Sequence, residues 1–368
     1  MSGYKISTKE AIAIIICPVI AYCLISLPRD ILTYQKSAVL LNIIYVSIIA
    51  IAFSCLIYKL FKSFSGKDIL DISEYLGGKT FRNILGIIFA SYLCISSAFL
   101  LRCFSEGLRI IYYSNTKLIF IVIVFIIGII LVNRLNSNSI FKANLIVIPI
   151  AFFSILFLLF ANMKIFHIQN MYPFFGEGIF NTFVTGLASL VSFNGLFLLY
   201  FLPPLLNEPE KFKKIAITSC LLTVFYLIIV FIIFLFIFSF FTNIDEIIPL
   251  YTVARTVEFG SFFQRLESIF LLIWIFAFGS YVAICMNFSM QIFKKIANLK
   301  ETKHLAAPFG LLILGITLFP KNYSIAKSFE TDIFPIISIG TVFILCIAIL
   351  ILANVKLKKK GTKIEKDF

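Results

Sequence analysis

Long uncharged stretches recur along the chain and are separated by short polar segments. Ten runs of sixteen or more residues contain no Asp, Glu, Lys, Arg or His. A membrane-spanning helix needs about 20 mostly apolar residues, and backbone groups in lipid must bond internally, so these runs predict helices rather than strands. The expected spans cover residues 9–28, 37–60, 84–112, 117–134, 142–162, 178–203, 214–242, 264–293, 305–320 and 332–355.

Composition supports a polytopic membrane protein. Hydrophobic residues make up 61% of the 368 residues and charged residues only 14%, whereas soluble domains are about 25% charged. This balance excludes a soluble enzyme, a disordered segment and a secreted disulfide scaffold. We expect one all-α transmembrane domain over residues 1–355, followed by a basic cytoplasmic tail over 356–368.

The distribution of basic residues predicts the orientation. Lys and Arg number 32 against 18 acidic residues. With the N-terminus inside, the inner segments hold 22 basic residues, the outer segments hold 9, and Arg102 lies inside the third span. Basic loops stay on the cytoplasmic side, so both termini are expected there. The positive net charge is then explained by topology and attraction to anionic lipid, and no nucleic acid partner is expected.

Motifs for catalysis or metal binding are absent from the sequence. It contains no Gly-rich phosphate loop, GxSxG or HExxH pattern. Its eight cysteines form no CxxC, and its two histidines lie in different loops. We therefore expect no enzymatic activity, no metal and no cofactor.

Two of the spans carry interruptions at corresponding places. Pro18 lies inside the first span and removes a backbone hydrogen bond, and Ser192-Phe193-Asn194-Gly195 lies inside the sixth. Both spans end in Leu-Pro, at Leu27-Pro28 and Leu202-Pro203. Ten spans with this correspondence suggest two five-helix inverted repeats, in which broken helices one and six form a ligand site near the bilayer midplane.

Polar or irregular positions near those interruptions are the candidate ligand contacts, with helix packing as the alternative for each. The candidates are Pro18, Ala21, Tyr22, Cys23, Ser97, Ser192, Phe193, Asn194 and Ser280.

Three charged residues in or beside spans are candidates for an intramembrane ion pair or gate. Arg102 and Glu106 are four residues apart, so they share one helix face. Charges inside a span usually face the bundle interior and are paired. Glu267 begins the eighth span. It is either an interfacial anchor or a partner of Arg102 across the bundle.

Several ordered motifs together resemble a known family. They are Leu24-Ile25-Ser26-Leu27-Pro28-Arg29-Asp30, Asp71-Ile72-Ser73-Glu74-Tyr75-Leu76-Gly77, Arg102-Cys103-Phe104-Ser105-Glu106, Ser192-Phe193-Asn194-Gly195 and Arg265-Leu266-Glu267-Ser268-Ile269-Phe270-Leu271-Leu272-Ile273-Trp274. With this order and spacing, the whole chain resembles the B subunits of GerA-type spore germinant receptors, which belong to the amino acid–polyamine–organocation superfamily.

The resemblance implies an amino acid permease fold and a role in sensing a small nutrient, most simply an amino acid, that triggers germination. It implies the inner membrane of a bacterial spore as location, and a membrane-anchored A subunit and a lipoprotein C subunit as partners. Two alternatives stay open. One is a proton-coupled amino acid transporter. The other is a structural subunit without ligand binding, because the first span lacks the glycine usual in the family.

Overall fold

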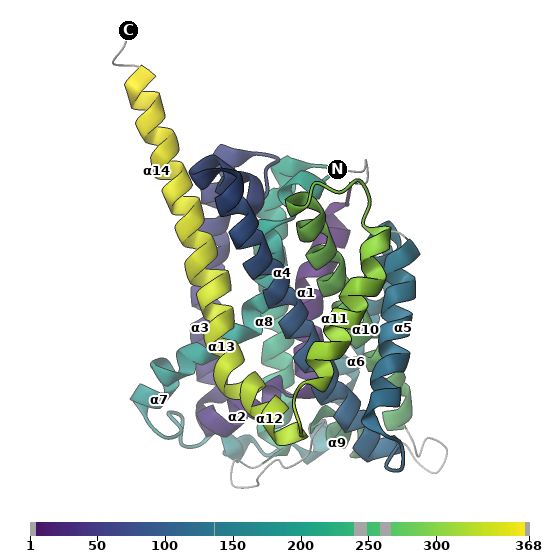
Figure 1. Ribbon diagram of the computed structural model, residues 1–368. Helices are drawn as coiled ribbons and strands as arrows, with labels where there is room; N and C mark the ends of the chain where they lie inside the picture. Colours follow the sequence, from purple (N-terminus) through teal and green to yellow (C-terminus); the bar gives the residue numbers. More distant parts are fainter. Residues whose placement is uncertain (1–4, 136, 239–248, 258–265, 365–368) are drawn as a thin grey trace.

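The computed structural model describes residues 5–135, 137–238, 249–257 and 266–364, and nearly all of them are helical (Figure 1). The α-helices are α1 (Thr8–Ile25), α2 (Leu27–Gln35), α3 (Val39–Phe61), α4 (Ile69–Tyr112), α5 (Leu118–Leu135), α6 (Ser137–Ala161), α7 (Ile179–Phe183), α8 (Phe212–Ile237), α9 (Pro249–Arg255), α10 (Leu266–Ile296), α11 (Ala306–Leu318), α12 (Tyr323–Ser328), α13 (Phe334–Ser338) and α14 (Cys346–Ile364). A long 3-10 segment, η5, covers Thr185–Tyr200, and two π-helical segments, η9 and η10, cover Phe329–Ile333 and Ile339–Leu345. Shorter 3-10 turns are η1 (Lys36–Ala38), η2 (Lys62–Phe64), η3 (Met163–Ile165), η4 (Ile168–Met171), η6 (Pro203–Leu205), η7 (Pro209–Lys211) and η8 (Lys303–Leu305).

The described helices confirm an all-α polytopic membrane protein. Nine of them are long and apolar enough to cross a membrane, and Lys303–Leu318 is a shorter apolar helix at the position of the ninth expected span. Two predicted span ends, 239–242 and 264–265, lie outside the described residues. Large apolar side chains such as Val124, Ile146 and Phe153 are more than 60% exposed, as expected for surfaces that contact lipid.

Helix α1 forms the centre of the bundle. It packs against α6, α8, α10 and η5, and all but a few of its residues are buried. A helix that is apolar on every face is expected in such a core position. Its start is fixed by a capping box in which Ser7 accepts from the Glu10 amide and Glu10 accepts from the Ser7 amide.

The two interrupted spans are broken where helices α1 and α2 meet and within η5. Ser26 ends α1 with φ −139° and ψ −28°, and Leu27-Pro28 starts α2 in a new direction. Phe193 departs from helical geometry inside η5, at φ −102° and ψ 19°. A 3-10 segment of this length is uncommon. Helix α1 continues without a break through Pro18. The break in the first span therefore lies at Ser26, near the end of that span.

Helix α4 begins with a short, partly buried helical segment before its main part crosses the bundle. Asp68 caps it by accepting from the amides of Leu70 and Asp71, and Gly78, with φ 75°, interrupts it ten residues later. The positive φ is readily adopted only by glycine. Asp68 also pairs with Lys295 of α10 at 2.7 Å. The first part of α4 is therefore a short helical segment that ends at a glycine, and an ion pair ties it to α10.

Replacing Asp68 is expected to separate its two roles. Asp68→Ala loses the cap, which costs about 1–2 kcal/mol, and leaves Lys295 with Asp71 alone. Asp68→Asn keeps a capping side chain and loses only the charge. Burial raises the pKa of Asp68, although the neighbouring Lys295 lowers it. Keeping the Asp68 carboxylate ionised therefore costs free energy, so Asp68→Asn should lose less stability than Asp68→Ala. The midpoint of thermal unfolding in detergent measures the stability of both variants. Glu208→Ala is the control, because Glu208 belongs to an exposed ion pair. A midpoint for Asp68→Ala equal to that of the wild type contradicts this account.

Candidate functional site

A cavity of about 590 Å³ opens at the end of the bundle opposite the termini (Figure 1). Its buried floor contains Tyr22, Ser26, Glu330 and Phe334, and exposed residues such as Tyr34 lie at its rim. We call it the outer cavity. Its full lining is Tyr22, Ser26, Leu27, Asp30, Ile31, Thr33, Tyr34, Gln35, Lys36, Glu177, Asn181, Thr185, Ala188, Ser189, Val191, Glu330, Thr331, Phe334 and Pro335.

The broken parts of three spans build this cavity. Its walls come from the α1–α2 junction, from α7 and the first half of η5, and from η9 with α13. Backbone that departs from regular helix is tolerated at membrane depth where it lines a cavity, and π turns are frequent at functional sites. The volume is within the range of about 300–1,000 Å³ typical of small-molecule sites.

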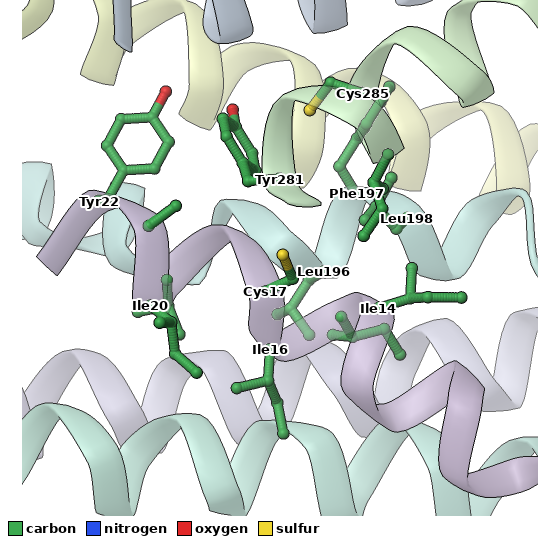
Figure 2. Close-up of a cluster of buried hydrophobic side chains, with 14 of the residues drawn as sticks. Ile14, Ile16, Cys17, Ile20, Tyr22, Leu196, Phe197, Leu198, Tyr281 and Cys285 are labelled. Atoms are coloured by element: carbon green, nitrogen blue, oxygen red, sulfur yellow. The ribbon is translucent and has the colours of Figure 1, made fainter. Parts of the chain in front are cut away.

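Aromatic rings and hydroxyl groups form the inner floor. Tyr22 stacks on Phe334 with ring centroids 5.7 Å apart and meets Tyr281 edge-on at the same distance. Figure 2 shows Tyr22 and Tyr281 side by side with both hydroxyl groups pointing the same way. The Ser96 hydroxyl lies between them, 3.0 Å from the Tyr22 oxygen and 2.5 Å from the Tyr281 oxygen. This chain of hydroxyls joins α1, α4 and α10 beneath the cavity.

Three charged side chains cluster beside the floor. The Lys327 ammonium lies 2.7 Å from the Asp30 carboxylate and 3.3 Å from that of Glu330. Glu330 is 6% exposed, and it also accepts from the Ser26 hydroxyl at 2.5 Å and from the Cys103 thiol at 3.2 Å. Buried charges are stable only when they are paired and hydrogen-bonded. The cluster therefore holds the α1–α2 junction against the last span.

Of the nine residues predicted to contact a ligand, only Tyr22 lines the outer cavity. Ser280 lines a separate, mostly apolar groove between α5, α6 and α10. The other seven are largely buried in the bundle; these are Pro18, Ala21, Cys23, Ser97, Ser192, Phe193 and Asn194. Their contact with a ligand stays a prediction.

Close packing fills the predicted midplane position. A side chain at Gly195 would overlap the backbone carbonyl oxygen of Ile15, so η5 and α1 lie in direct backbone contact. Close approach of two backbones at glycine is a common form of helix packing in membranes. The cavity consequently lies closer to the end of the bundle opposite the termini than the two interrupted spans alone suggest (Figure 1).

The intramembrane charges of α4 form a second, separate group. Arg102 contacts Glu106 at 3.0 Å, and both are nearly fully buried. Glu106 also pairs with Arg109 at 2.9 Å, and Arg102 donates to the Thr317 carbonyl of α11 at 3.5 Å. The carboxylate that pairs with Arg102 is thus Glu106. Glu267 lies in the first turn of α10, close to Tyr251.

Asp30, Lys327 and Glu330 were not among the predicted site residues. Residues 321–331 fall between the expected spans, and their charged residues are typical of an outer loop. The available signal was the spacing of Lys327 and Glu330, three residues apart directly before the last apolar run. The pairing with Asp30, almost 300 residues away in sequence, carries no sequence signal.

Comparison with known proteins assigns the fold and the family. The chain is similar to a Na⁺-coupled sialic acid symporter solved in a substrate-bound outward-open state, with a TM-score of 0.68 and 11% identity over 93% of this chain and 80% of that one. This likeness confirms the amino acid permease (LeuT-like) fold.

Sequence relatives come from Bacillus subtilis (strain 168). Spore germination protein YndE is 25% identical over 98% of both chains, and spore germination protein A2 is 24% identical over 86% of this chain and 85% of its own. Spore germination protein B2 is 23% identical over 61% of both. The spore germination protein family matches residues 5–326. The chain therefore belongs to the spore germination permease family.

Proposed function

We propose that this protein is the nutrient-sensing subunit of a spore germinant receptor and that it binds an amino acid in the outer cavity. The observation that carries the proposal is the cavity itself. It is large enough for a small molecule, and its buried floor carries polar side chains where the first, sixth and last spans meet. Ligands in transporters of this architecture bind at discontinuous helices. The protein is proposed to act by binding and conformational change, without catalysis.

The proposal includes a location and partners. The excess of basic residues on the segments at the two termini favours a cytoplasmic position for both. In the inner membrane of a spore, the outer cavity then faces the side from which nutrients arrive. The relatives named A2 and B2 are spore germination proteins. Their similarity supports assembly with a membrane-anchored A subunit and a lipoprotein C subunit.

Equilibrium binding of twenty labelled amino acids to the purified protein tests the proposal. Ala188 lines the outer cavity and is exposed. Ala188→Trp is expected to weaken binding about tenfold or more, since a steric cost of about 1.4 kcal/mol suffices for that factor. Leu187→Trp is the control, because Leu187 is an exposed neighbour outside the lining.

Saturable binding that Ala188→Trp abolishes and Leu187→Trp preserves supports the outer cavity as the ligand site. Equal binding by both variants places the ligand elsewhere. If the wild type binds none of the twenty amino acids, the sensing proposal fails in this form.

A transporter is the second candidate, favoured by the fold shared with a sialic acid symporter. Reconstituted vesicles with an imposed proton gradient distinguish the two. A sensor binds the amino acid without accumulating it, whereas a proton-coupled transporter concentrates it inside the vesicles. Accumulation above the external concentration contradicts a purely sensory role.

A further inference from the structure

In the ion pairs of the described residues, the two carboxylates beside the outer cavity share one cation. Asp30 and Glu330 share the single ammonium group of Lys327. Arg29 is the other cation that acts on Asp30, from the adjacent position on α2. Glu330 lies deeper than Asp30, with its side chain 5% exposed against 16%. The buried end of the cluster therefore has the greater need of a positive charge.

The sharing between the two carboxylates is unequal. Lys327 approaches Asp30 to 2.7 Å but Glu330 only to 3.3 Å. The remaining donors to Glu330 are neutral, namely the Ser26 hydroxyl and the Cys103 thiol. A thiol is a weak donor, and charge-assisted bonds are roughly twice as strong as neutral ones. Among the described residues, the cation nearest to Glu330 is thus one that lies closer to Asp30.

A cation inside the outer cavity can contact Glu330. Glu330, Ser26 and Asp30 line the outer cavity, whereas Lys327 is not part of its lining. An occupant of the cavity can therefore reach Glu330 from the side that Lys327 does not occupy.

A second buried acceptor also lines the outer cavity. Gln35 is 4% exposed, and its Nε2 donates to the Asn181 carbonyl at 3.3 Å. Within the described part of the chain, its Oε1 has no hydrogen-bond partner. An unpartnered buried acceptor is costly, so this oxygen also favours an occupant that donates hydrogen bonds.

The aromatic rings of the floor are packed against one another. Phe334 stacks on both Tyr22 and Tyr92, with ring centroids 5.7 Å and 6.0 Å apart. These rings therefore give the floor apolar surface beside Glu330. The lining thus combines a carboxylate that shares its cation, a buried amide oxygen without a partner among the described residues, and apolar aromatic surface.

We propose that Glu330 is the residue that recognises a primary ammonium group on the ligand, supplying the specificity of the outer cavity for amines. The ligand's ammonium provides Glu330 with a further positive charge, and Lys327 stays with Asp30. This inference rests on the proposed function, since it assigns a chemical group to the same cavity.

Competition in the binding assay tests the charge preference without any mutation. For an amino acid that binds, the probes are its decarboxylated amine and its deaminated acid, which share one side chain. The amine is expected to displace the labelled amino acid and the acid is not. If the acid displaces it as well as the amine does, the inference is wrong while ligand binding itself stands.

A conservative variant tests the residue. Glu330→Gln keeps an acceptor for Ser26 and removes the charge. It is expected to weaken amino acid binding about 10- to 100-fold, the usual range for loss of a charged hydrogen-bond partner. Asp332→Asn is the matched control, because Asp332 is an exposed acid two residues away and outside the lining.

Each outcome decides one of the two claims. Unchanged affinity in a folded Glu330→Gln protein overturns the assignment of Glu330 and leaves the sensing function intact. Absence of binding by the wild type overturns both. If Glu330→Gln does not fold, the comparison of amine and acid on the wild type still decides the charge preference.

Discussion

Replacing Lys327 by methionine is expected to destabilise the protein by about 3–5 kcal/mol, the usual cost of removing one partner of a buried ion pair. Methionine keeps most of the volume but leaves Asp30 and Glu330 without their shared ammonium. Two carboxylates so close together then repel each other in a water-poor site. Thermal unfolding of the detergent-purified protein measures the loss.

A second substitution provides the decisive comparison. Lys327→Met combined with Glu330→Gln removes one positive and one negative charge, so the double variant should recover a large part of the stability lost in Lys327→Met. Such coupling is expected between side chains in direct contact. Lys321→Met, at an exposed position, controls for the loss of a surface lysine. If the double variant is less stable than Lys327→Met, the cluster does not act as described.

Replacing Gly195 by alanine is expected to cost at least about 3 kcal/mol, the upper end of the usual cost of overpacking. The new Cβ overlaps the carbonyl oxygen of Ile15. That oxygen belongs to the backbone of the central helix and cannot rotate away as a side chain does. The expected result is a large fall in the yield of monodisperse protein and in its thermal midpoint.

The matched control is a glycine with free space around it. Gly315 lies in the exposed part of α11, and a Cβ there meets nothing within 4 Å. Gly315→Ala is expected to be neutral or stabilising by up to about 1 kcal/mol, because alanine favours helix. Equal behaviour of the two variants would mean that α1 and η5 do not depend on backbone contact.

The spans were predictable from the sequence because bilayer thickness imposes length and apolarity on each helix. A local signal also identified the pairing of Arg102 with Glu106. These features depend on residues within a few positions of one another. The family followed from ordered motifs over the whole chain.

The position of the candidate site was less predictable, because it depends on contacts distant in sequence. Asn194 lies next to the irregular Phe193, whereas helix α1 continues through Pro18. The protein packs both residues into the bundle and opens its cavity closer to the end opposite the termini (Figure 1). Lys327 and Glu330 resemble loop residues in sequence, since charge alone ends an apolar run. Their burial follows from the approach of Asp30 and Ser26, which only the folded structure reveals.

The length of the last span determines how far a small tilt moves its end. From Phe334 on the cavity floor to Ile364, helical residues run without interruption, and α14 projects well beyond the bundle (Figure 1). At about 1.5 Å per residue this is a lever of about 45 Å. A tilt of about 5° at the floor therefore displaces the far end by about 4 Å. A small rearrangement at the cavity floor would therefore produce a larger movement at the far end of α14.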